Sequence, residues 1–191
     1  MPDLLHRLLL NRFIAIFLGI VMAGCASLSE DQCRKGGWQH LGEVDGSVGY
    51  PLERITAHRE ACAEYGIQPK DAEYRFGHEA GLRSYCTLPN ALKEGLSGRS
   101  YQGVCIGPIG HRFAEIHAAA YSVHRARAEV DSIRDEIHKT EREMRSEKTP
   151  AERKKSLQED LRHLERKLQR VRDDQRSREL HLDLATRLIT Q

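Results

Sequence analysis

The chain has 191 residues, of which 39% are hydrophobic, 30% are charged and only 6% are aromatic. The 30 Lys and Arg residues nearly balance the 28 Asp and Glu residues, which gives a net charge of +2. Without a strong basic excess, nucleic acid is excluded as the main partner. The low apolar and aromatic content also disfavours a large enzyme core.

The first 24 residues are predicted to form a lipoprotein signal peptide. Two arginines precede an apolar run over 13–22, which is too short for a transmembrane helix and suits a signal peptide. The run ends in Met22-Ala23-Gly24-Cys25, which resembles the bacterial lipobox, although the family pattern prefers Leu in place of Met22. The resemblance implies cleavage before Cys25 and its lipidation with acyl chains such as palmitate. An ordinary signal peptide with a chance cysteine is the alternative.

Such an anchor attaches a protein stably to the lipid bilayer, because each buried CH₂ contributes about 0.8 kcal/mol and two or more chains are present. In Gram-negative lipoproteins an Asp directly after the lipidated cysteine favours retention in the inner membrane. Ala26 and Ser27 stand there in this chain, so the resemblance implies the periplasmic face of the outer membrane. Residues 25–32 are expected to be the lipidated cysteine and a short tether.

Four cysteines remain beside Cys25, and an even number in an exported chain predicts two disulfides. Of three possible connectivities we expect the local pairs, Cys33–Cys62 and Cys86–Cys105. Cys33 is expected to open one helix and Cys62 to close the next, which places them side by side in an antiparallel hairpin. Each bridge closes a loop of roughly 20–30 residues and stabilises the fold by about 3–4 kcal/mol. No Cys-x-x-Cys pair is present, so zinc is disfavoured. We expect no metal and no cofactor.

Residues 33–108 are predicted to form a small helical domain. A helix start is expected over Ser29–Gln32, because a Ser followed three residues later by Gln is typical of a capping box. Proline before and glycine after a segment mark further helices. These are expected over 52–65, 69–85 and 89–98, with an irregular stretch over 100–110.

Glycines recur at helical spacing in this domain: Gly42 and Gly46 follow Trp38, Gly77 and Gly81 follow Tyr74, and a degraded third copy covers 91–101. Glycines at i and i+4 lie on one helix face and let another backbone approach. Because glycine inside a helix costs about 1 kcal/mol relative to Ala, its repetition favours close packing in a small core. A glycine-faced surface for a partner helix or a membrane is one alternative, and a loop over 42–49 is another.

Several motifs occur together over roughly 25–105: the lipobox, Ser27-Leu-Ser-Glu-Asp-Gln-Cys33, Trp38…Gly42…Asp45-Gly46, His58-Arg59…Cys62, Gly81-Leu82…Tyr85-Cys86 and Tyr101-x-Gly103-Val104-Cys105. In combination they resemble an uncharacterised family of proteobacterial lipoproteins, known as a domain of unknown function that is commonly followed by a coiled coil. The resemblance implies a location in the cell envelope and gives no activity.

Residues 109–191 are predicted to form a long antiparallel helical hairpin with its turn near 147–151. Apolar or small residues recur there in steps of four and three, which is the heptad seam of a coiled coil. They are Ala126, Val130, Ile133, Ile137, Thr140 and Met144 before the turn, and Leu157, Leu161, Leu164, Leu168 and Val171 after it. The seam weakens at Gln175 and Arg178 and returns at Leu182, Ala185 and Ile189. Pro150 favours a hairpin over one kinked helix that pairs in an oligomer.

No set of residues has the spacing of a named catalytic mechanism. His58 lies at i and i+4 with Cys62, but a disulfide at Cys62 leaves it as a helix-surface residue. The other polar residues that we considered as site candidates are weaker. They are His78 and Glu79 beside a glycine, His117 and His124 at heptad spacing, and Asp45, which is expected to cap or turn.

We therefore expect an all-α protein, in which a small disulfide-stapled helical domain is followed by a coiled-coil hairpin. The expected function is that of a non-enzymatic envelope lipoprotein. It would be a scaffold or interaction module that docks on another periplasmic or outer-membrane component, or that self-associates through the hairpin. The alternative is a small ligand- or metal-binding periplasmic module that uses His58, His78 and Glu79. A cell-wall hydrolase ranks third, because the sequence identifies no cleft carboxylate for it.

Overall fold

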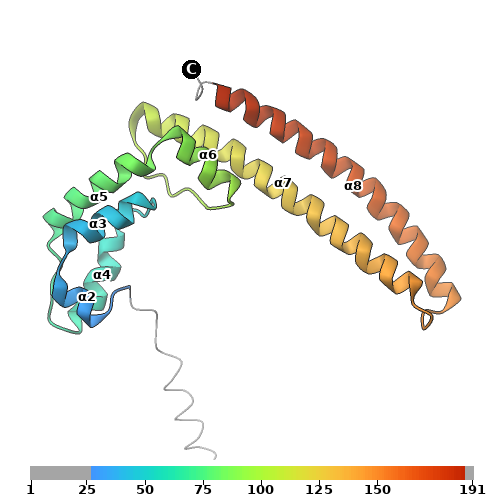
Figure 1. Ribbon diagram of the computed structural model, residues 1–191, viewed down its shortest axis with the longest axis horizontal. Helices are drawn as coiled ribbons and strands as arrows, with labels where there is room; N and C mark the ends of the chain where they lie inside the picture. Colours follow the sequence, from blue (N-terminus) through green and yellow to red (C-terminus); the bar gives the residue numbers. More distant parts are fainter. Residues whose placement is uncertain (1–26, 188–191) are drawn as a thin grey trace, which may run out of the picture.

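The computed structural model describes residues 27–187, so the predicted signal peptide, Cys25 and Ile189 lie outside the described residues. Over this range the chain forms seven α-helices and no strand (Figure 1). None of these helices is both long and apolar enough to cross a membrane. The helices are α2 (Glu30–Lys35), α3 (Trp38–Ser47), α4 (Arg54–Ala63), α5 (Asp71–Tyr85), α6 (Leu88–Leu96), α7 (Gly107–Arg145) and α8 (Ala151–Thr186).

Helix α2 begins with the capping box that the sequence predicts. The Ser29 backbone N–H donates to Gln32 Oε1 over 2.8 Å, and the Gln32 backbone N–H donates to Ser29 Oγ over 3.4 Å. Leu28, directly before this cap, is 5% exposed and packs in a core with Cys33, Trp38 and Tyr74. The residues expected as a tether therefore already belong to the folded part from Ser27 onward.

The two disulfides join Cys33 to Cys62 and Cys86 to Cys105, so the expected pairing is confirmed. The expected reason for the first pair is wrong, because α3 lies between α2 and α4 along the chain. Cys33 and Cys62 therefore do not come from consecutive helices of a hairpin. The bridge fastens the short helix α2 to the end of α4, while the second bridge fastens the end of α5 to the segment before α7.

Helices α3 and α5 pack with their backbones in close approach. A Cβ atom added to Gly42 or Gly46 would overlap the backbone of α5, and one added to Gly77 or Gly81 would overlap the backbone of α3. The four glycines therefore face one another inside the fold. The alternative of a loop over 42–49 is wrong, because α3 continues to Ser47 and only Gly49 takes a positive φ, of 78°.

Helix α6 packs in the same manner on the first turns of α7. Gly95 faces Ala120 and the carbonyl oxygen of His117, and Ala91 shares a buried cluster with Phe113 and Ile116. Helix α7 then continues unbroken out of this cluster into the C-terminal hairpin (Figure 1). It starts at Gly107, inside the stretch over 100–110 that was expected to be irregular.

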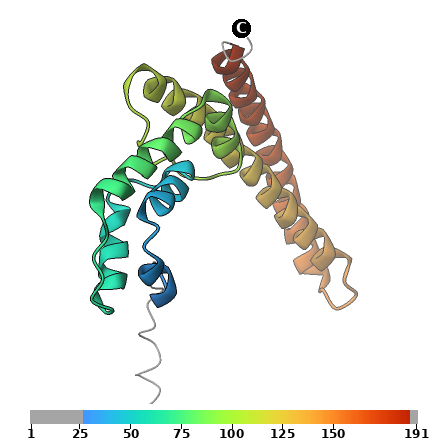
Figure 2. The same cartoon turned by 60° about the vertical axis from the view of Figure 1, so that its left-hand side comes forward.

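Helices α7 and α8 run antiparallel and are joined by residues 146–150, so the alternative of one kinked helix is wrong (Figures 1 and 2). Ion pairs join the two arms from Arg127 to Glu179 over 3.0 Å and from Arg153 to Glu143 over 2.8 Å. The seam follows the predicted periodicity, because its most buried members are Ala126, Val130, Ile133, Leu157 and Leu164. The tip of the hairpin lies far from helices α2–α5 (Figure 2).

Candidate functional site

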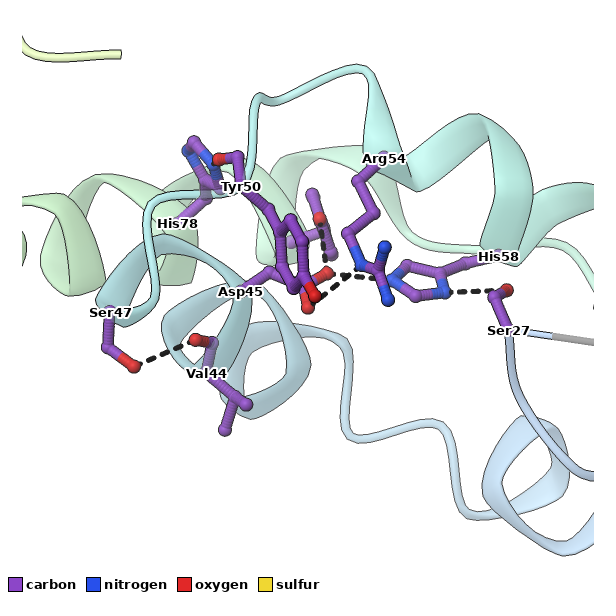
Figure 3. A network of polar contacts seen from close by, with 9 residues as sticks. Ser27, Val44, Asp45, Ser47, Tyr50, Arg54, His58 and His78 are labelled. Atoms are coloured by element: carbon purple, nitrogen blue, oxygen red, sulfur yellow. Dashed lines mark hydrogen bonds and ion pairs between the residues drawn. The ribbon is translucent and has the colours of Figure 1, made fainter. Parts of the chain in front are cut away.

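A buried polar network lies where α3, α4 and α5 meet, and Asp45 is at its centre (Figure 3). The side chain of Asp45 is almost fully buried. Its Oδ2 accepts hydrogen bonds from His58 Nε2 over 2.7 Å and from the Tyr74 hydroxyl over 2.7 Å. His58 and Tyr74 are themselves 1% and 0% exposed. One carboxylate therefore joins three helices in a region from which water is excluded.

Arg54 supplies a positive charge at the edge of this network. Its Nε lies 3.3 Å from Asp45 Oδ1 in an ion pair, and its guanidinium stacks 3.8 Å above the ring of Tyr50. Tyr50 also takes part through its backbone, since its carbonyl oxygen accepts a hydrogen bond from His78 Nε2 over 2.7 Å. A buried carboxylate needs such partners, because an unpaired one would be strongly destabilising.

The partners of Asp45 keep it ionised. Burial by itself raises the pKa of a carboxyl group, but hydrogen bonds from His58 and Tyr74, with the charges of His58 and Arg54, outweigh it and lower the pKa of Asp45. The same contacts act in the opposite sense on the phenol. Burial and the adjacent Asp45 carboxylate raise the pKa of Tyr74 well above its ordinary value, so it stays a hydrogen-bond donor.

The glycine packing brings these groups into contact. Asp45 lies three residues after Gly42 and one before Gly46, so all three share the buried face of α3 that meets α5. Gly42 packs against the backbone of Tyr74. This close packing brings the hydroxyl of Tyr74 within hydrogen-bond distance of Asp45. The expectation that Asp45 caps or turns is therefore wrong, because it lies within α3 and its side chain points into the core.

Ser27 extends the network toward the N-terminal end of the described chain. Its hydroxyl lies 3.0 Å from His58 Nδ1, so His58 bridges a hydroxyl and a carboxylate (Figure 3). In hydrolases this order of groups activates a nucleophilic serine. Here the imidazole is buried and the carboxylate is shared with Tyr74 and Arg54, so a substrate has no direct access to the ring. The arrangement is suited to hold Ser27 and α4 in place.

The expectation that His58 is a surface residue is wrong for the same reason, since its ring is buried against Asp45. His78 is also buried, and with the exposed Glu79 and Arg75 it lines a groove of about 300 Å³ that His58 does not line. The structure therefore does not gather His58, His78 and Glu79 at one point. Over residues 27–187, no three His, Cys, Asp or Glu side chains are grouped to hold a metal ion.

Two histidines of α7, His117 and His124, bind backbone carbonyl groups. His117 Nε2 donates to the Arg99 carbonyl oxygen over 2.8 Å, and His124 Nδ1 donates to that of Leu96 over 3.1 Å. Both rings stack in a row with Tyr121. They tie the end of α6 and the segment that follows it to α7.

A second groove, of about 420 Å³, is lined by the segment after α3, by the end of α5 and by α6 with the residues after it, and the pair Glu94 and Arg99 lies in its wall. Two hydrogen bonds of 2.6 and 2.8 Å join the pair. Tyr85 borders the same groove, and burial together with the charge of Glu94 raises its pKa to about 12. Glu94 and Arg99 were not predicted as site residues from the sequence.

Fold and network together define a class: an all-helical protein with two disulfides, glycine-packed helix pairs and a buried acid–histidine–tyrosine network. Residues 37–122, just under half of the chain, are similar to the family described as "Protein of unknown function (DUF2799)". The comparisons with curated proteins and with solved structures found no match.

The resemblance to a family of unknown function is thereby confirmed, but over 37–122 in place of the expected 25–105. There is a structural reason why the matched region ends at residue 122 and not at 105. Phe113, Ile116 and Ala120 are fully buried, and they complete the core beneath α6. The first turns of α7 therefore belong to the domain, whereas α2 lies before the matched region.

Proposed function

We propose that this protein is a non-enzymatic lipoprotein of the bacterial envelope. It is anchored in the outer membrane through lipidated Cys25 and docks on another envelope component through its helical hairpin. The domain of unknown function is the folded base at the membrane, and α7 and α8 are the projecting arm.

The observation that best supports the membrane anchor is the position of Cys25 in the sequence. The other four cysteines, Cys33, Cys62, Cys86 and Cys105, pair with one another in two disulfides. Cys25 follows a basic and then apolar stretch that is typical of a signal peptide. Leu28, three residues later, is already part of the core. This order supports a lipobox whose cysteine lies directly before the folded domain.

The compartment is supported by chemistry and by the residues beside Cys25. Disulfides form and persist in oxidising surroundings such as the periplasm. Ala26 and Ser27 follow Cys25 where an Asp would favour the inner membrane. We therefore assign the protein to the periplasmic face of the outer membrane.

The docking role is supported by the shape of the hairpin. The 39 residues of α7 and the 36 residues of α8 correspond to arms of about 55 Å at 1.5 Å per residue. We infer that the arms form a coiled coil, because their seam repeats in steps of four and three. The tip, with Glu147, Lys148 and Pro150 exposed, is the part that a partner meets first.

Site-specific photo-crosslinking in living cells tests the docking role. A photoreactive amino acid replaces Lys148 at the tip, and in a matched control it replaces the exposed Lys70 before α5. We expect one dominant protein adduct from Lys148 and not from Lys70. Self-adducts alone would replace the docking role by oligomerisation through the hairpin. No adduct from Lys148, with the protein present in the membrane, would contradict docking through the tip.

A further inference from the structure

A mostly apolar groove of about 290 Å³ lies beside the point where the chain enters the described fold. Leu28 and Trp38, both almost fully buried, line it together with the half-buried Leu41 and the exposed Val44. The exposed side chains of Gln32 and Lys35 also border it. The groove belongs to neither the buried network nor the hairpin. Val44 points away from Asp45, on the other side of α3 (Figure 3).

The groove lies within reach of Cys25. Leu28 comes three residues after Cys25, and a fully extended chain covers at most about 3.6 Å per residue, so the two Cα atoms are at most about 11 Å apart. Ser27 shortens the free part further, because its hydroxyl is bound to the buried His58. An acyl chain on Cys25 therefore starts next to the groove.

From this juxtaposition we propose that the groove holds one acyl chain of the lipid on Cys25. The inference rests on the proposed lipidation. A hydrocarbon chain suits the apolar lining, and it would cover the side chain of Val44, which is 45% exposed. The remaining acyl chains stay in the bilayer. With one chain held by α3, the domain is fixed against the membrane at a defined face, and the hairpin that continues from it takes a defined direction.

The test uses the full chain in living cells that are fed a fatty acid carrying a diazirine and an alkyne. After irradiation the protein is purified and digested with trypsin. Cleavage after Lys35 and Arg54 releases one peptide, residues 36–54, that contains Trp38, Leu41 and Val44. We expect the acyl chain on Cys25 to be crosslinked to this peptide within the same molecule.

Two variants make the result specific. Val44→Glu puts a charge into the groove, and Phe76→Glu puts the same charge on α5 at a residue that is 61% exposed and does not line the groove. Both sites are exposed, so both variants are expected to fold, and circular dichroism checks this. Crosslinking to residues 36–54 should fall several-fold in Val44→Glu and stay unchanged in Phe76→Glu.

The possible outcomes distinguish a failure of acyl-chain binding in the groove from a failure of the lipid anchor at Cys25. Incorporation at Cys25 with crosslinks only to phospholipids would overturn the groove and leave the anchor intact. Equal crosslinking in wild type and Val44→Glu would also overturn the groove. No incorporation at Cys25 would refute the anchor and, with it, the acyl chain as the occupant.

Discussion

Replacing Gly77 by Ala should destabilise the domain, although Ala is the better helix former. A Cβ at this position would overlap the carbonyl oxygen of Gln39, and it would lie 2.7 Å from the carbonyl carbon of Gln39 and 3.0 Å from the backbone nitrogen of Glu43. Carbon atoms in contact normally lie about 3.5–4.0 Å apart. These neighbours are all backbone atoms of α3 and cannot rotate away, so α3 and α5 have to separate by more than about 1 Å.

The magnitude follows from two opposing effects. Overpacking costs about 1–3 kcal/mol, and contact with backbone on two sides favours the upper end. Ala regains about 1 kcal/mol through its helix propensity. The net loss is about 2 kcal/mol, which for a chain of this length lowers Tm by about 4–8 °C. Separation of the helices also lengthens the hydrogen bond from Tyr74 to Asp45.

The fluorescence of Trp38 is the assay of choice, because it is the single tryptophan of the chain and lies in the core as the first residue of α3. Urea unfolding followed at Trp38 reports the domain and not the hairpin. Gly37→Ala is the control, since a Cβ at Gly37 has no atom within 4 Å. If Gly77→Ala unfolds at the same urea concentration as Gly37→Ala and wild type, close backbone packing does not stabilise this fold.

Three further predictions concern the buried network and the hairpin. Asp45→Asn removes the charge that His58 and Arg54 meet, and should lower the free energy of unfolding by about 3 kcal/mol at neutral pH; a midpoint at Trp38 equal to wild type would contradict the network. The folded state lowers the pKa of Asp45, so the stability that it contributes is complete above its ordinary pKa of 3.8 and is lost as the pH falls below it. Between about pH 5 and about pH 3, the free energy of unfolding should therefore fall more steeply with decreasing pH in wild type than in Asp45→Asn. Equal slopes in the two proteins would count against the assignment of this pH dependence to Asp45. Leu164→Asp places a charge in the buried seam between α7 and α8 and should reduce helical circular dichroism, whereas Leu180→Asp, at a residue 61% exposed, should not; equal spectra would argue against the seam.

The parts of the fold that repeat along the chain could be predicted from the sequence. Steps of four and three mark Val130, Ile133 and Leu164 as seam residues, and the structure buries all three. Glycines at i and i+4 indicate close packing, and Gly42 and Gly77 meet opposing backbones. In each case the signal lies within a single helix, where periodicity reports which face is buried.

The network could not be predicted in this way, because its members come from three helices. Asp45 and Tyr74 are 29 residues apart, and no local spacing relates them. One signal was nevertheless present: Asp45 shares a helix face with Gly42 and Gly46, so close packing of that face buries its carboxylate. A buried carboxylate then requires partners, and His58 is a candidate, together with Arg54 four residues before it. The exact partners depend on how α4 crosses α3, which the sequence does not show.

The proposed function depends on lipidation of Cys25 as the membrane anchor of the protein. It can be tested by measuring the mass of the intact protein purified from cell membranes. We expect a chain that begins at Cys25 and carries the added mass of a diacylglyceryl group with or without a third acyl chain. A chain that begins at another residue, or that contains an unmodified Cys25, would contradict it.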